Sequence, residues 1–144
     1  MKRFQYPVLL TAAEEGGYVV TCRDLPSLIT QGEDEQDALT QATDAMDEVF
    51  ATYMTEGIAF PEPSKARRRE HLVAPPAETL AKAALYVAMR EAGISKVQLA
   101  KRLGVDEKEV RRLLDPHYGS KLPRIAEAIS SLGQHLVIGL ERLT

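Results

Sequence analysis

Residues 95–114, with the sequence SKVQLAKRLGVDEKEVRRLL, decide the fold of the second half of the chain. Ser95 is followed three residues later by Gln98, which is the pattern of a capping box at a helix N-terminus. Gly104 is typical of a tight turn, where a side chain would clash or the backbone would need a positive φ. Asp106 is a good N-cap for a second helix. The stretch therefore predicts two short helices joined by a tight turn.

The spacing of small and apolar residues in this stretch is more specific than either helix alone. Two short helices that cross steeply need a small residue where they touch, and Ala100 is in that position. Gly104 follows four residues later, and Val110 and Leu113 supply apolar anchors on the second helix. These offsets resemble the helix-turn-helix of Cro/repressor-type DNA-binding domains, and the resemblance extends to residue 138.

Basic side chains crowd the exposed positions of this region. Lysine and arginine neutralise DNA phosphates, and arginine and glutamate can read guanine and cytosine. The resemblance implies the following DNA-binding residues: Glu107, Lys108, Arg111 and Arg112 at base edges, and Lys96 and Lys121 at phosphates. Because Asp106, Glu107 and Glu109 make the start of the second helix acidic, the alternative is a helix pair used as a scaffold or dimer interface.

The first half of the chain carries a different pattern. Alternating apolar residues, a Gly16-Gly17 turn and a β-branched return segment predict a β-hairpin. Apolar residues at spacings of three and four then predict one long amphipathic helix. The expected strands are residues 4–12, 18–22, 27–31 and 71–74, and the expected helix is residues 33–55. We therefore predict an α+β protein: an antiparallel sheet with a long helix, followed by an all-α half.

The two halves have opposite charge. Residues 1–64 contain 3 Lys/Arg and 12 Asp/Glu, a net charge of −9, whereas residues 65–144 contain 15 Lys/Arg and 9 Asp/Glu, a net charge of +6. This asymmetry fits a basic partner for the first half and a polyanion for the second, or two merely solvated surfaces. Prolines and charges in residues 61–70 predict an exposed connector, and Pro75-Pro76 separates domains of residues 1–74 and 77–144.

Several short segments of the first half resemble the HicB antitoxin domain in order and spacing. They are residues 6–11, 15–20, 24–26, 30–33 and 37–38, with 61–64 matching the segment that closes that domain. The resemblance implies a partial RNase H-like fold for residues 1–74. It also implies a type II antitoxin that binds a HicA-type toxin, a small basic RNA-cleaving ribonuclease, and represses its own operon through double-stranded operator DNA.

Two contact regions follow from this interpretation. Asp24, Leu25 and Pro26 are candidate toxin-binding residues, since an exposed strand break can present an acid and an apolar side chain together; a simple loop is the equal alternative. Operator binding by such a domain needs a homodimer or higher oligomer. The apolar ending, residues 136–138 with Leu140 and Leu143, is either the dimer contact or packs within its own subunit.

The sequence predicts no catalytic set, metal site or cofactor. Residues 4–13 contain no Asp or Glu, so the first strand lacks the carboxylate that metal-dependent RNase H chemistry needs. Cys22, the single cysteine, rules out an internal disulfide and is expected to be a small strand residue rather than a reactive thiol. No apolar run is long enough to span a membrane and no secretory segment is recognised, so we expect a cytoplasmic protein.

Two other functions remain open at this point. A stand-alone transcription regulator would use the acidic half to sense a small ligand in an apolar pocket, and its gene would have no toxin neighbour. A metal-dependent nuclease would bind divalent metal ions and cleave nucleic acid, although the first strand lacks the necessary acid.

Overall fold

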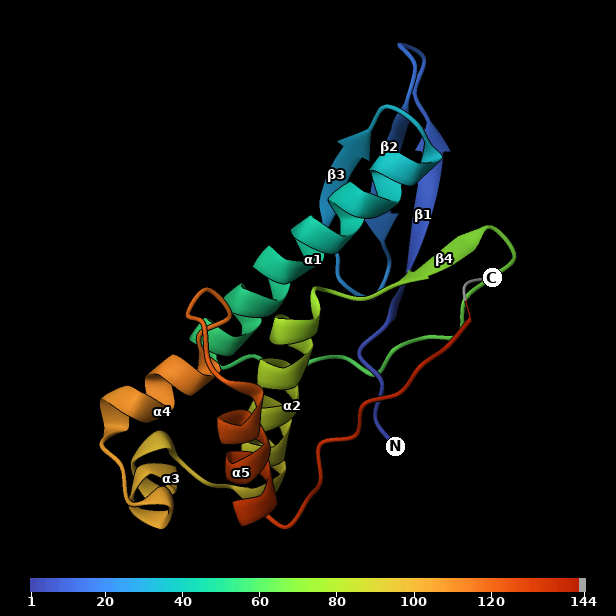
Figure 1. Cartoon of the computed structure of the whole chain (residues 1–144). Helices are drawn as coiled ribbons and strands as arrows, with labels where there is room; N and C mark the ends of the chain where they lie inside the picture. Colours follow the sequence, from blue (N-terminus) through green and yellow to red (C-terminus); the bar gives the residue numbers. More distant parts are fainter. Residues whose placement is uncertain (143–144) are drawn as a thin grey trace. The chain divides into compact units, whose positions relative to one another are not determined.

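The computed structural model describes residues 1–142 and divides the chain into two compact units. The first unit ends at Leu80 and the second begins at Ala81. Four strands and a long helix come first and a series of helices follows, so the predicted α+β class is confirmed (Figure 1). None of the helices in the described part of the chain is long and apolar enough to cross a membrane.

The first unit is an antiparallel sheet with one long helix. The strands are β1 (Tyr6–Ala12), β2 (Tyr18–Cys22), β3 (Ile29–Gly32) and β4 (Glu70–Val73), in the order β3-β2-β1-β4. The helix α1 (Glu35–Glu56) lies across one face of the sheet (Figure 1). The third strand begins two residues later than predicted, because the Leu28 amide donates to the Leu25 carbonyl in a turn.

The side of the sheet that faces α1 forms the core of this unit. Val8 and Val20 are fully buried there, and the residues that follow them on β1 and β2 are exposed. Ala38, Ala42, Met46 and Phe50 recur along one side of α1 and are also fully buried. Asp34 caps the helix by accepting from the Asp37 amide, and Gly57 ends it in the left-handed conformation.

Gly32 allows α1 to begin close to the end of β3. A Cβ at this position would lie 2.3 Å from the amide nitrogen and 2.4 Å from the Cα of Ala38. Such distances are far inside van der Waals contact, and the obstructing atoms are backbone atoms of a buried helix turn. Glycine is therefore required at position 32, because the backbone of α1 lies too close for any side chain.

The second unit is helical. It contains most of α2 (Ala77–Ala92), followed by α3 (Lys96–Leu103), α4 (Glu107–Leu114) and α5 (Leu122–Ser131). Its core includes these fully or almost fully buried side chains: Leu85, Leu99, Val110, Leu113, Ile125, Ala128 and Ile129. Residues 134–142, after α5, have no helix or strand.

The two short helices lie where the sequence predicts them. Ser95 and Gln98 form the complete capping box, and the Asp106 side chain accepts from the Glu109 amide at 2.9 Å. Gly104 has a φ of +69°, and nothing lies within 4 Å of an added Cβ. Of the two reasons considered for this glycine, the structure thus selects the positive φ and excludes a clash.

Candidate nucleic-acid and protein interfaces

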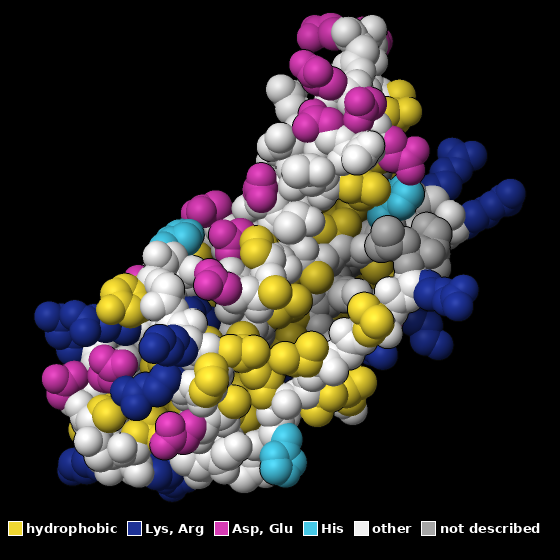
Figure 2. Space-filling view, viewed as in Figure 1, with side chains coloured by type: hydrophobic (Ala, Val, Ile, Leu, Met, Phe, Trp, Pro, Cys, Tyr) yellow, Lys and Arg dark blue, Asp and Glu magenta, His cyan; other side chains and the backbone are white. Residues whose placement is uncertain are grey.

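The exposed side of α3 is basic. Lys96 and Lys101 are exposed, and Arg102 donates to the Ser131 carbonyl at 3.0 Å. Basic side chains also gather over α4, with some acidic ones among them, and acidic side chains gather over the hairpin end of the sheet and α1; a second basic group lies beside β4 (Figure 2). The two units therefore differ in surface charge, although the exposed basic residues Lys65 and Arg67 to Arg69 belong to the first unit.

The two arginines of α4 are held by acids on their own helix. Arg111 Nη1 lies 3.2 Å from Glu107 Oε1, and Arg112 Nη1 lies 3.8 Å from Glu109 Oε2. The side chains of Arg111 and Arg112 are 57% and 39% exposed, respectively. Exposed pairs of this kind contribute at most about 1 kcal/mol, so a phosphate or a base edge can replace the acid as partner.

The other predicted DNA-contact residues lie on α4 or at the start of a neighbouring helix. Lys108 on α4 and Lys121, the residue before α5, are both exposed. Arg124 on α5 lies 3.5 Å from Glu109, so this acid is shared by arginines of two helices. The candidate set thus consists of exposed or partly exposed side chains of α3, α4 and the start of α5.

A buried lysine fixes the end of α4 and is not among the predicted site residues. Lys82 of α2 is fully buried, and its Nζ donates to the Arg112 carbonyl at 2.7 Å and to Ser120 Oγ at 2.8 Å. A positive charge at the carboxyl end of a helix is favourable. The ring of Tyr118 lies 5.3 Å from the Arg112 guanidinium carbon. Lys82 precedes buried Leu85 and Tyr86 by three and four residues, and this helical spacing was the available signal.

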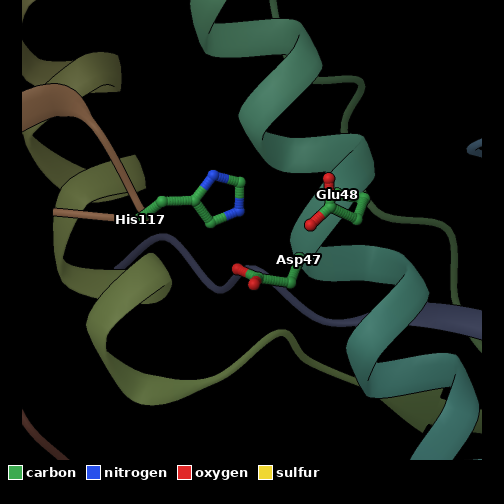
Figure 3. Close-up of side chains that lie close together, drawn as sticks. All are labelled: Asp47, Glu48 and His117. Atoms are coloured by element: carbon green, nitrogen blue, oxygen red, sulfur yellow. The ribbon is translucent and has the colours of Figure 1, made fainter.

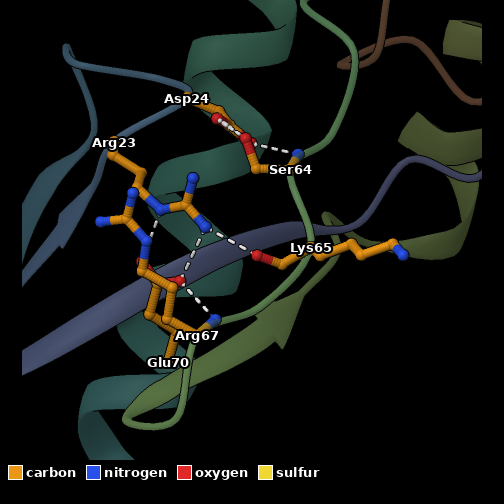
Figure 4. Close-up of polar contacts among 6 residues, drawn as sticks. All are labelled: Arg23, Asp24, Ser64, Lys65, Arg67 and Glu70. Carbon is orange, nitrogen blue, oxygen red and sulfur yellow. Dashed lines mark hydrogen bonds and ion pairs between the residues drawn. The ribbon is translucent and has the colours of Figure 1, made fainter.

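The structure contradicts one premise of the toxin-contact prediction for Asp24, Leu25 and Pro26. Leu25 is fully buried, so it is not the exposed apolar side chain that the prediction required. Asp24 accepts hydrogen bonds from the amide and the hydroxyl of Ser64, at 2.8 and 2.7 Å (Figure 4). Pro26 is exposed. Two of the three residues therefore hold the unit together.

The segment before β4 is largely exposed at residues 65–69, as predicted for a connector, and it is also anchored by hydrogen bonds. Arg23 donates to both carboxylate oxygens of Glu70 at 2.9 Å and to the Lys65 carbonyl at 2.7 Å (Figure 4). The Arg67 amide donates to the same carboxylate. The Arg23 guanidinium holds the pKa of Glu70 at about 2, well below its ordinary value. The side chains of residues 67–69 remain exposed.

Two other titratable side chains of the first unit, Cys22 and Tyr6, are buried. Cys22 is buried, and its burial raises the pKa of the thiol, which disfavours the nucleophilic thiolate. Burial likewise raises the pKa of Tyr6, whose hydroxyl donates to the Pro61 carbonyl at 2.8 Å. Figure 3 draws Asp47 and Glu48 of α1 with His117, which lies in the second unit, so the three side chains do not form a site within one unit. Within the first unit, Asp47 accepts a hydrogen bond from Thr79.

Comparison with known proteins identifies the family. The model of the HicB-like antitoxin of bacterial toxin–antitoxin systems matches residues 5–84. This chain belongs to the HicB-like antitoxin family. It is 34% identical over 132 residues to Antitoxin HicB of Escherichia coli strain K12, covering 92% of this chain and 96% of the relative. Antitoxin HicB 1 of Photorhabdus laumondii is 30% identical over 141 residues, covering 98% and 90%, respectively.

The family match covers a shorter part of the chain than the matches to the HicB antitoxins do. The family model ends at residue 84, so it spans the sheet unit and the beginning of α2. Antitoxin HicB of Pseudomonas fluorescens is 31% identical over 139 residues, or 96% of this chain. The similarity to these HicB antitoxins therefore continues through α3, α4 and α5.

Proposed function

We propose that this HicB-like protein is a type II antitoxin that neutralises a HicA-type toxin by direct binding and represses its own operon through DNA. The observation that carries the proposal is the family membership of the acidic sheet unit, combined with full-length similarity to HicB antitoxins. An acidic surface accelerates encounter with a basic ribonuclease and steers it into place. Residues 1–74 bind the toxin in this account, and residues 77–144 bind the operator.

DNA binding is assigned to α3 and α4 acting as a helix-turn-helix. In this arrangement α4 enters the major groove, where Glu107, Lys108, Arg111 and Arg112 face base edges. Lys96 and Lys121 contact phosphates on either side. The capped helices, the positive φ of Gly104 and the exposure of the basic side chains support this assignment.

A homodimer or higher oligomer is part of the proposal, because an operator with two half-sites needs two reading helices. The segment after α5 supports it. Val137, Ile138 and Leu140 are 62%, 75% and 100% exposed, although all three are large apolar residues. Contact with a second copy would remove them from water. Leu143, which belongs to the same predicted contact, lies outside the described residues.

The proposed role is non-enzymatic. Inhibition by covering the toxin requires shape and charge and no reacting group on the antitoxin. The nuclease alternative would need convergent carboxylates that begin on the first strand, and β1 carries no Asp or Glu.

Co-purification with the product of the adjacent gene tests the proposal. We expect a tagged chain to retain a small basic protein, to abolish its RNA cleavage, and to shift a DNA fragment that contains the promoter of the gene pair. A chain that binds neither this protein nor the promoter would contradict the proposal. Binding of a small molecule, in the absence of a toxin neighbour, would instead favour the ligand-responsive regulator.

A further inference from the structure

The sheet of the first unit has an open face opposite α1, defined by Leu9, Thr11, Val19, Thr21, Ile29 and Leu72. Side chains alternate between the two faces of a strand, so Leu9, Val19 and Thr21, beside buried Val8 and Val20, point away from α1. Pro7 lies on the same side but is buried, so the exposed part of this face on β1 begins at Leu9. The register places Thr21 directly between Leu9 on β1 and Ile29 on β3. Leu72 lies on the same side of β4, next to buried Val73.

This open face exposes large apolar side chains. Ile29 is 68% exposed, Leu72 51%, Leu9 38% and Val19 36%. Single exposed apolar residues are common, whereas several on one flat sheet face indicate a surface that another molecule covers. By contrast, no large apolar residue of α1 is exposed among the described residues, since the outer side of that helix is polar and acidic.

The acidic residues at one end of the open face suit a basic partner, whereas exposed Arg67 to Arg69 precede the edge strand β4. The two charged residues of the face, Arg23 and Glu70, are bonded to each other, so the centre carries no unpaired charge. Pairing of Tyr18 with Gly32 brings the turn after β1 and the residue after β3 to the same end of the sheet. Exposed Glu14, Glu15 and Glu33 lie at that end. An apolar centre with a charged rim is the usual anatomy of a protein interface.

The size of the face supports a protein rather than a small ligand. Four strands spaced about 4.8 Å apart and at most seven residues long present a flat area on the order of 450 Å². Each partner in a stable complex buries about 800 Å². A docked protein would therefore extend beyond the strands and cover the acidic end as well.

We infer that the open face is the surface on which the basic toxin docks, with Thr21 at its centre and Glu14, Glu15 and Glu33 at its rim. This inference rests on the proposed function and replaces the strand break at residues 24–26 as the contact region. The apolar side chains supply the buried contacts, and the acids steer the toxin and fix its orientation. The outer side of α1 is the alternative docking surface.

The test compares the same substitution on the two surfaces of the full-length chain. Thr21→Arg puts a long cation at the centre of the open face, and Thr40→Arg puts one on the exposed side of α1. The probe is a HicA-type toxin that carries an active-site substitution abolishing RNA cleavage. We expect Thr21→Arg to weaken toxin binding about 100-fold, because like charges juxtaposed in an interface cost several kcal/mol. Thr40→Arg should stay within about threefold of wild type.

The outcomes separate this inference from the proposed function. If wild type binds the toxin and Thr21→Arg binds it equally well, the docking surface is wrong and the antitoxin function stands. Loss with Thr40→Arg alone would move the toxin to α1. If wild type does not bind the toxin, both proposals fail. Ile29→Lys, on the edge strand, repeats the test should Thr21→Arg not fold, as judged by its circular dichroism.

Discussion

The open sheet face exposes mainly apolar side chains, whereas the α3–α4 surface exposes mainly charged ones. On the sheet, apolar residues are exposed and the Arg23–Glu70 charges satisfy each other within the face. On α4, apolar residues are buried, while Arg111 and Arg112 are exposed or partly exposed and weakly paired. The first arrangement favours a protein that can bury apolar area, and the second favours phosphates and base edges. This difference is the one that the proposal of two separate partners requires.

The largest expected effect comes from removing the arginines of α4. Arg111→Ala with Arg112→Ala should weaken operator binding about 100-fold or more, because each bidentate base contact contributes about 1–3 kcal/mol. An electrophoretic shift assay over a salt series measures this effect, and toxin binding should be unchanged. Arg68→Ala with Arg69→Ala removes the same charge from the first unit and serves as the control. Equal loss with the control would mean that overall charge, rather than α4, binds the DNA.

Gly32→Ala should destabilise the first unit. The added methyl group meets the backbone of Ala38, and overpacking of this kind costs about 1–3 kcal/mol. Hydrogen exchange resolved by residue would show lower protection in β1, β2 and α1. Protection in α3–α5 should persist, because those helices belong to the second unit. A uniform decrease along the chain would show that the units unfold together.

Gly104→Ala should have a smaller effect, confined to the second unit. The cost here is the left-handed conformation, about 1–2 kcal/mol, because the space around the glycine is open. Operator affinity should fall modestly and toxin affinity should not. Asparagine tolerates positive φ better than alanine, so Gly104→Asn should recover part of the loss. Equal loss for both variants would contradict the conformational explanation.

The smallest effect is pH-dependent. The pKa of Glu70 falls to about 2 in the folded protein from an ordinary 4.5, so its contribution to stability is complete above about pH 5. That contribution is lost as the pH falls from about 4.5 toward 2. Wild type should therefore exceed Glu70→Gln in denaturation midpoint at pH 6, and the difference should shrink by pH 3. A constant difference across this range would assign the loss to packing rather than charge.

Local rules in the sequence predicted most of the fold. The hairpin turn, the periodicity of α1 and the caps at Ser95 and Asp106 each depend on residues a few positions apart. The exposed basic residues of α3 and α4 followed from the same helical periodicity. For these elements, the interactions that specify the structure join residues that are close together in the sequence.

The errors concern contacts between residues distant in sequence. Asp24 and Ser64 are 40 residues apart, and Arg23 and Glu70 are 47 apart. Nothing near Leu25 indicates that it is buried, since an Asp-Leu-Pro segment fits an exposed turn equally well. The open face was also missed, because alternation along β1 and β2 shows that a strand has two faces but not which of them lacks a helix.

The most direct measurement determines both affinities, for inactivated toxin and for operator DNA, in two full-length variants. Thr21→Arg should lose toxin binding and retain operator binding, and Arg111→Ala with Arg112→Ala should do the reverse. This reciprocal pattern would establish that separate surfaces serve the two partners. A folded variant that lost both activities, or a Thr21→Arg protein that bound toxin as tightly as wild type, would contradict the account.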